Sequence, residues 1–310
     1  WIFNASTNLF NYHKHLYDDE VSYFLTIDSQ SIGKRVVDKV HLANPNITIT
    51  TYNSYAKYEE DLINLISSGK KWFGEQFNYD SKKSFDFSIP DLIQSEDVNI
   101  KIAVAARSFQ QSIFNIDVNS SSLTSLVVPS VSPEYAQEYA KEASSVFACL
   151  VTSPAINIDL EYNSLDYGAT AWLDYIQINS RSKIRLSDNY LIFRDITSLG
   201  NGIGEYRVEN ASDIKIWDIT DPTSVSSLIT LLDGTTLSFN DSLDVLHEYI
   251  AFNSLSYKKP NLKGSISNQD VRGISYNVEF VIVAHPVFLP AANRLSEFHL
   301  LHDNIISEVV

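Results

Sequence analysis

The sequence has 310 residues, of which 44% are hydrophobic and 20% charged, so it holds enough apolar material for one or two packed cores and too much for a disordered chain. Lysine and arginine number 23 against 38 aspartates and glutamates, a net charge of −15, which argues against nucleic acid and anionic membranes as partners. No window approaches the roughly 18 apolar residues of a transmembrane segment, and the single cysteine excludes an internal disulfide and a cysteine-based zinc cluster.

Most of the chain has the composition of β-strands and turns, because aromatic and β-branched residues lie in short runs bounded by Asn, Asp, Ser and Gly. Turn clusters recur about every ten residues, which favours an antiparallel β-sandwich or jelly roll. In chain order, the clearest expected strands are Val21–Ile27, Ile47–Thr51, Ser84–Ile89, Val98–Ala105, Ser112–Val118, Ala155–Tyr162, Ala171–Asn179 and Asn189–Phe193.

Several of these strands alternate apolar and polar residues with a period of two, which leaves one face for a core and one for water. The side chains expected to face one sandwich core are Phe85, Phe87, Ile158, Leu160, Trp172 and Ile176. Two stretches differ from this pattern. Tyr55–Ser67 has helical spacing and stops before Gly69, which predicts a helix, whereas Pro133–Val146 suits either a helix or a strand. We therefore expect residues 1–75 to form a strand and helix segment that packs on a sandwich of residues 76–265.

The pattern changes towards the C-terminus. Tyr276–Ala284 ends in the continuous apolar run of a buried strand, Phe288–Asp303 has helical period, and Ile305–Val310 begins a second apolar run. Strand, helix and strand make a βαβ unit, which needs parallel neighbours to bury its faces. We expect residues 266–310 to be the truncated start of an α/β domain.

Five segments, in this order along the chain, resemble the gingipain-like cysteine peptidases that act as C-terminal signal peptidase, or sortase, of the type IX secretion system. The segments are SGKKWFGEQF at Ser68–Phe77, FDFSIP at Phe85–Pro90, AWLDYIQINSRSKIRL at Ala171–Leu186, EYRVENASDIKIWDITDP at Glu205–Pro222 and FVIVAHPVFLPAANRLSEFH at Phe280–His299. The resemblance extends over essentially the whole chain. A different secreted gingipain-type peptidase would share the α/β start, but would be less expected to match both the WFGE and the LDYI segments.

The resemblance implies a β-rich N-terminal region followed by a caspase-like α/β peptidase domain. It further implies a surface enzyme at the outer membrane that removes the C-terminal signal domain of secreted cargo and transfers the cargo to lipopolysaccharide, without a cofactor. Its partners would be the cargo and an outer-membrane component of the secretion system. The catalytic Cys and His would lie beyond Val310, so this chain would scaffold the peptidase and be inactive alone. The alternative is an extracellular β-sandwich module that binds a glycan or the cargo's signal domain.

The cysteine and the histidines are the first candidate site residues. Cys149 lies in the apolar run VFACLV, which is typical of a structural cysteine rather than a nucleophile. His285 follows the expected buried strand, at the edge where α/β folds bind ligands, and is the one predicted binding residue. His299 and His302 lie three residues apart on one helix face, but without a specific metal motif we expect them to be unligated.

Two further groups of residues could bind a ligand, but each also fits an ordinary structural role. Asp213, Asp218 and Asp221 offer oxygen ligands for calcium, but their spacing is not that of a calcium loop and favours turns. Trp72 and Phe73 could form an aromatic binding platform, although aromatic residues in a strand-rich chain are more often core. No metal site is predicted.

Overall fold

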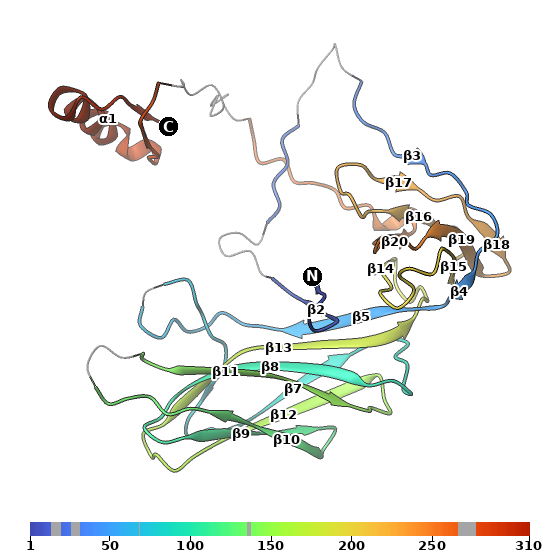
Figure 1. Cartoon of the computed structure of the whole chain (residues 1–310), viewed down its shortest axis with the longest axis horizontal. Helices are drawn as coiled ribbons and strands as arrows, with labels where there is room; N and C mark the ends of the chain where they lie inside the picture. Colours follow the sequence, from blue (N-terminus) through green and yellow to red (C-terminus); the bar gives the residue numbers. More distant parts are fainter. Residues whose placement is uncertain (14–19, 26–31, 68, 135–137, 266–276) are drawn as a thin grey trace. The chain divides into compact units, whose positions relative to one another are not determined.

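The computed structural model describes residues 1–13, 20–25, 32–67, 69–134, 138–265 and 277–310. These form two compact units, Trp1–Tyr257 and Lys258–Val310. Almost all of the regular secondary structure in the described part of the first unit is β-strand, as the sequence predicts. Its strands make two sandwiches, each with its own apolar core (Figure 1).

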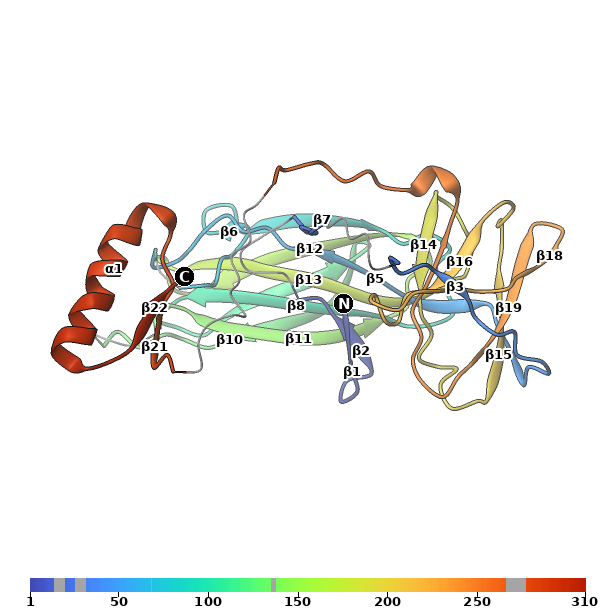
Figure 2. The ribbon, with the colours of Figure 1, turned by 90° about the horizontal axis from the view of Figure 1, so that it is seen from above.

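The first sandwich has two antiparallel sheets. One has the order β10-β9-β12-β7, and the other has the order β11-β8-β13-β5, with β6 paired to β13. Figure 2 shows β5, β13, β8 and β11 side by side. The strands are β5 (Thr51–Tyr58), β6 (Gln76–Phe77), β7 (Lys82–Ser88), β8 (Val98–Arg107), β9 (Ser112–Val118), β10 (Ser121–Val128), β11 (Lys141–Cys149), β12 (Ala155–Ser164) and β13 (Thr170–Lys183).

The core of the first sandwich follows from the alternation in the sequence. Ile158 and Leu160 of β12 are fully buried against Ile100 and Ile102 of β8, and the residues between them face outwards. Each such side chain removes enough apolar area from water to stabilise the fold by about 1.5–3 kcal/mol. The period-two pattern therefore assigns the inner face of these strands correctly.

Trp172 is the exception among the expected core residues. A β-bulge at Asp174 shifts the register between Leu173 and Tyr175, so the residues before and after it alternate in opposite phase. Leu173 and Ile176 both face the main core, whereas Trp172 packs on the other side of β13 in a small cluster with Phe73 and Ala105. The prediction that Trp172 faces the sandwich core is therefore wrong, although its ring is buried.

The second sandwich combines late strands with two short strands from the N-terminal part of the chain. Its sheets have the orders β14-β20-β16-β17-β3 and β18-β19-β15-β4, and β3 and β4 pair in parallel with β17 and β15. Tyr206, Phe239 and Tyr249 lie at the centre of its core. The strands are β3 (Val37–Asp38), β4 (Ile47–Ile49), β14 (Tyr190–Phe193), β15 (Ile203–Val208), β16 (Lys215–Asp218), β17 (Ser226–Ser227), β18 (Leu231–Asp233), β19 (Thr236–Ser242) and β20 (Tyr249–Phe252).

The predicted helix at Tyr55–Ser67 is wrong, because the start of this segment belongs to β5 and pairs with β13 in antiparallel register. Ala56 and Tyr58 pack on the core, so alternation and pairing outweigh the local helical spacing. Two other segments also differ. Residues 21–25 of the expected strand Val21–Ile27 are not in a strand, and its last two residues lie outside the described residues. In Pro133–Val146 the strand β11 begins at Lys141.

The remaining elements are a hairpin and the C-terminal unit. β1 (Ile2–Asn4) and β2 (Leu9–Asn11) pair antiparallel, and a 3₁₀ helix η1 (Ser254–Ser256) follows β20. The C-terminal unit contains β21 (Phe280–Ile282), a 3₁₀ turn η3 (Pro286–Phe288), α1 (Leu289–Phe298), a π-helical turn η4 (His299–Asp303) and β22 (Ser307–Val309). β21 and β22 pair in parallel, which confirms the βαβ unit. Within the described residues, no helix has the length and apolar character needed to cross a bilayer.

Candidate functional site

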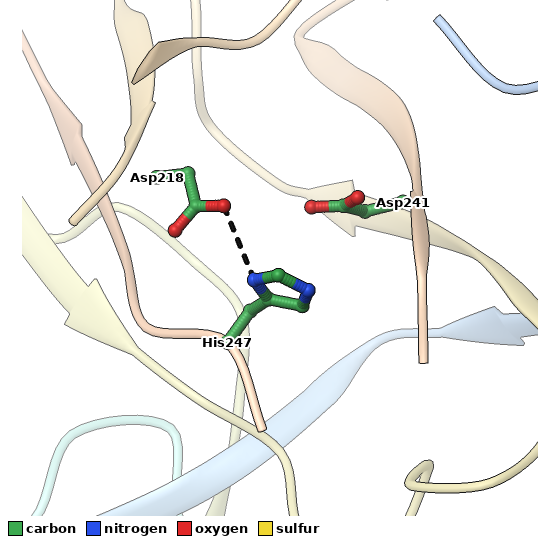
Figure 3. Close-up of side chains that lie close together, drawn as sticks. All are labelled: Asp218, Asp241 and His247. Carbon is green, nitrogen blue, oxygen red and sulfur yellow. Dashed lines mark ion pairs between the residues drawn. The ribbon is translucent and has the colours of Figure 1, made fainter. Parts of the chain in front are cut away.

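Three side chains with metal-binding atoms meet inside the second sandwich. Asp218 ends β16, Asp241 lies on β19, and His247 lies in the connection from β19 to β20. One ligand atom from each lies within 4.8 Å of the others (Figure 3). Both aspartates are buried. A buried pair of acids needs a positive charge beside it, because an uncompensated carboxylate is costly in the interior.

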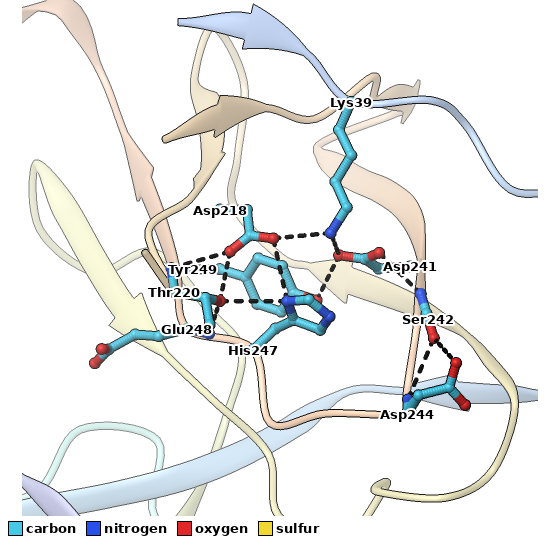
Figure 4. A network of polar contacts seen from close by, with 9 residues as sticks. All are labelled: Lys39, Asp218, Thr220, Asp241, Ser242, Asp244, His247, Glu248 and Tyr249. Carbon is cyan, nitrogen blue, oxygen red and sulfur yellow. Dashed lines mark hydrogen bonds and ion pairs between the residues drawn. The ribbon is translucent and has the colours of Figure 1, made fainter. Parts of the chain in front are cut away.

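Lys39, which directly follows β3, supplies that charge. Its Nζ atom lies 2.8 Å from Asp218 Oδ2 and 2.6 Å from Asp241 Oδ2 (Figure 4). The backbone N–H of Lys39 donates to the carbonyl of Ser227, 2.7 Å away, and extends the short pairing of β3 with β17. The ammonium group therefore fastens an N-terminal segment to two strands far along the chain.

The other donors around the two carboxylates come from the same strands and the loops beside them. Tyr249 donates its hydroxyl to Asp241 Oδ2 at 2.9 Å, and the backbone N–H of Ser242 donates to Asp241 Oδ1 at 2.8 Å. Thr220 donates to Asp218 Oδ1 through its backbone N–H at 3.0 Å and its hydroxyl at 2.5 Å. All four carboxylate oxygens thus have a donor.

Burial and hydrogen bonding shift the pKa values of the side chains in this cluster. Burial alone would raise the pKa of Asp218, but hydrogen bonds from His247, Lys39 and Thr220 outweigh it and hold that pKa well below its usual range. Burial would lower the pKa of Lys39, and its bonds to Asp218 and Asp241 raise it instead. Burial, together with the adjacent carboxylates, raises the pKa of Tyr249. The charged forms of the lysine and of Asp218 are therefore favoured near neutral pH.

The donor set of Asp218, Asp241 and His247 does not fit a resident metal ion, because the Lys39 ammonium already lies between the two carboxylates. A divalent cation would have to displace that group. The arrangement is instead a structural ion-pair cluster, in which one lysine neutralises two buried acids and links the segment after β3 to β16 and β19.

Sequence reasoning identified Asp218 but grouped it with the wrong partners. Asp221 accepts from the backbone N–H of Thr223 in an exposed turn, and Asp213 has a positive φ of 57°, as turn residues often do. In the structure Asp218 lies with Lys39, Asp241 and His247 instead. Lys39 is 179 positions from Asp218 and 202 positions from Asp241 along the chain. One local signal was available, since Asp241 continues the buried alternation of Leu237 and Phe239. An acid on a core face indicates a buried partner.

The predicted binding residue His285 precedes the turn η3. Its Nδ1 atom accepts from the backbone N–H of Val287 at 3.3 Å, which caps the turn. In the turn η4, His299 Nδ1 lies 2.7 Å from Asp303 Oδ2, and the His302 ring packs on Phe298 at the end of α1. The ligand role of His285 stays a prediction.

Cys149 ends the edge strand β11 and is half-buried against the first core. Burial, and secondly the charge of Asp97, raises the pKa of its thiol. Since the thiolate is the reactive form, this setting disfavours nucleophilic chemistry at Cys149. Of the possible aromatic platform, Trp72 is exposed, whereas Phe73 is buried with Trp172.

No family model and no curated protein matches the sequence. Two matched structures are CBM36 modules, one from a xylanase of the hindgut metagenome of Trinervitermes trinervoides and one in complex with calcium and xylotriose. The xylanase module is 12% identical to this chain, with a TM-score of 0.28 over 42% of this chain and 94% of the module. The module with calcium and xylotriose is also 12% identical, with a TM-score of 0.26 over 40% of this chain and 98% of the module. These scores are too low to bear on fold or function.

A solved structure described as dimeric latent PorU from Porphyromonas gingivalis is similar to this chain, with a TM-score of 0.72 and 16% sequence identity. The likeness covers 89% of this chain and 27% of the PorU chain, so the chain spans about a quarter of the length of that protein. At this identity the likeness shows the fold. The chain therefore has a PorU-like fold over most of its length.

Proposed function

We propose that this chain is the N-terminal scaffold region of a gingipain-like cysteine endopeptidase that processes cargo of the type IX secretion system. The observation that carries the proposal is the likeness in fold to PorU, which covers 89% of the chain. The five ordered segments resembling that family support it independently of the structure.

In this proposal the reaction takes place in a part of the full-length protein outside this chain. A cysteine thiolate attacks the scissile carbonyl and forms a thioester, a histidine protonates the leaving amine, and an acceptor on lipopolysaccharide resolves the thioester. The leaving segment is the C-terminal signal domain of the cargo, and the enzyme works at the bacterial cell surface, held there by an outer-membrane partner. Cys149 is half-buried against the apolar core of the first sandwich, and this burial raises the pKa of its thiol, so the proposal assigns the nucleophile to another cysteine.

A cleavage assay with the full-length protein tests the proposal. A peptide that spans a cargo signal-domain junction is incubated with the full-length protein, with its Cys149→Ser variant and with this chain alone, and the products are identified by mass spectrometry. We expect the first two to cleave the peptide equally and the chain alone not to cleave it. Iodoacetamide should abolish cleavage by the Cys149→Ser variant, because the nucleophile is a second cysteine.

Two results would contradict the proposal. If the full-length protein cleaves no junction peptide, the chain does not belong to a signal peptidase. If Cys149→Ser removes the activity, the nucleophile lies in this chain and the scaffold role is wrong. The alternative, an extracellular β-sandwich module that binds a glycan or the cargo's signal domain, stays a prediction.

A further inference from the structure

The N-terminal hairpin lies on the outer face of β13 in the manner of a bound peptide (Figure 1). Asn179 Oδ1 accepts from the backbone N–H of Phe10 at 2.8 Å, and Asn179 Nδ2 donates to the carbonyl of Phe10 at 3.0 Å. Gln177 Nε2 donates to the carbonyl of Tyr12 at 3.4 Å. Two side-chain amides thus hold the main chain of this segment through three hydrogen bonds, and none of these bonds depends on which side chain the bound residue carries.

The spacing of these amides matches an extended peptide. Residues two apart on a strand project from the same face about 6.6 Å apart, and Gln177 and Asn179 contact Tyr12 and Phe10, which are also two apart. The bound segment therefore runs antiparallel to β13 while lying on its face. Asn11, the residue between, accepts weakly from Lys101 Nζ at 3.4 Å.

Neighbouring side chains form two sites for aromatic rings. Phe10 is 1% exposed, and the guanidinium carbon of Arg194 lies 4.1 Å from the centre of its ring. Lys57 Nζ lies 3.2 Å from the centre of the Tyr12 ring. Tyr55, which pairs with Asn179 across the strands, completes the first site at 6.3 Å from Phe10. A cation over the face of an aromatic ring is attracted by the ring's electrons, and more strongly when it is partly desolvated.

The face also has one acceptor that its present occupant does not use. Gln177 is 3% exposed, and its Oε1 atom is buried without a hydrogen-bond partner. Leaving such an atom unpaired is costly, because it has lost its hydrogen bonds to water without gaining a partner. The Gln177 amide already donates from Nε2 to the carbonyl of Tyr12. A peptide that lay slightly closer to β13 would also donate a backbone N–H to Gln177 Oε1. Gln177 would then bind both the N–H and the carbonyl of one residue, as Asn179 binds those of Phe10.

We propose that this face, formed by Tyr55, Lys57, Gln177, Asn179 and Arg194, is a docking site for an extended peptide with the pattern aromatic-x-aromatic from another polypeptide. In this structure the chain's own Phe10–Tyr12 segment occupies the site and blocks it. Being on the same chain raises the effective concentration of that segment, typically to about the millimolar range. An incoming peptide binds well only when it outcompetes the segment or when the segment is weakened.

A fluorescein-labelled peptide with the sequence of Trp1–Tyr12 provides the probe, and its binding to the whole chain is followed by fluorescence anisotropy. Because the Phe10→Ala chain holds its own segment poorly, it should bind the probe at least about tenfold more tightly than the wild-type chain does. Adding Asn179→Leu should reduce that binding about tenfold or more. The matched control is Asn163→Leu, an exposed asparagine on β12 in the other sheet, which should leave binding unchanged.

A second measurement uses the wild-type chain and does not depend on the stability of any variant. Excess unlabelled peptide should displace the native segment and speed hydrogen exchange at the Phe10 amide, which Asn179 otherwise protects. The proposal is overturned if a folded Phe10→Ala chain binds the probe no more tightly than wild type, or if the Phe10 amide is unaffected by excess peptide. Analytical ultracentrifugation with and without the probe gives a further check. If the probe binds only while dimers of the chain dissociate, the natural occupant of the site is the hairpin of a second copy, and the proposal is also overturned.

Discussion

At the scale of single residues, the most consequential side chain is Lys39. It carries the positive charge for two buried aspartates that come from different strands of the second sandwich. The side chain of Asp241 is only 2% exposed, so the carboxylate has little water to replace a lost partner. Removing one member of such a group is costly because a charge remains buried without compensation.

We therefore predict that Lys39→Met lowers the free energy of unfolding by about 3 kcal/mol at pH 7. Urea unfolding followed by circular dichroism measures the effect. The control Lys183→Met, at an exposed position on β13, should change stability by less than about 0.5 kcal/mol. Asp241→Asn in the Lys39→Met background should recover part of the loss. Equal losses in the two lysine variants would show that the ion pairs contribute nothing.

A pH dependence follows from the lowered pKa of Asp218. Because its folded-state pKa lies below the unfolded value of about 3.9, the carboxylate contributes stability that is fully present above that value and is lost as the pH falls through the folded-state pKa. The stability difference between wild type and Asp218→Asn should be constant above about pH 5 and shrink below about pH 4. A difference that stays constant down to pH 2.5 would refute the assignment.

At the scale of elements, close packing joins the short strand β4 to the second sandwich. Gly204 of β15 pairs in parallel with Ile47, and a Cβ atom at Gly204 would lie 2.6 Å from Ile49 Cδ1 and 3.0 Å from Leu243 Cδ1. Both side chains belong to the core. The absence of a side chain at this residue allows an N-terminal strand to lie against a strand that follows it by more than 150 residues.

We expect Gly204→Ala to destabilise the chain by about 1–3 kcal/mol, because an added methyl group overpacks this contact. Thermal unfolding gives the comparison with Gly168→Ala, where the nearest atom to a new Cβ is Asp166 Oδ1 at an ordinary 3.5 Å. That control should stay close to wild type. An unchanged melting temperature for Gly204→Ala would mean that β4 can move aside without cost.

At the scale of the whole molecule, stability is expected to differ between the two compact units. Trp1–Tyr257 contains two sandwich cores with many fully buried side chains. The described residues of Lys258–Val310 form the short helix α1 with the turns η3 and η4, and a parallel pair of three-residue strands. Phe280 and Val281 of β21 are more than 40% exposed. Two strands on one helix bury too little apolar surface for a highly stable unit.

Native-state hydrogen exchange tests this difference. Amides of Val281 and Ile282 should exchange much faster than those of Ile158 and Leu160, which lie in a fully buried part of β12. The same measurement in the full-length protein should show slower exchange in β21 if the scaffold proposal holds. Equal protection of β21 and β12 in a monomeric sample of this chain would show that the C-terminal unit is fully stable by itself.

Composition and periodicity were enough to predict the β class, the inner face of strands such as β12, and the βαβ order of the C-terminal unit. These features are local, because period-two and helical patterns of apolar residues can be recognised from residues close together in the sequence. Features that depend on pairing between distant segments become visible only in the folded chain. Tyr55 and Tyr58 lie in a strand because β13 pairs with them, and Trp172 leaves the main core because of a bulge. Lys39 meets Asp241 only because β3 is added to a sheet of late strands, and no local pattern encodes a contact across 202 residues.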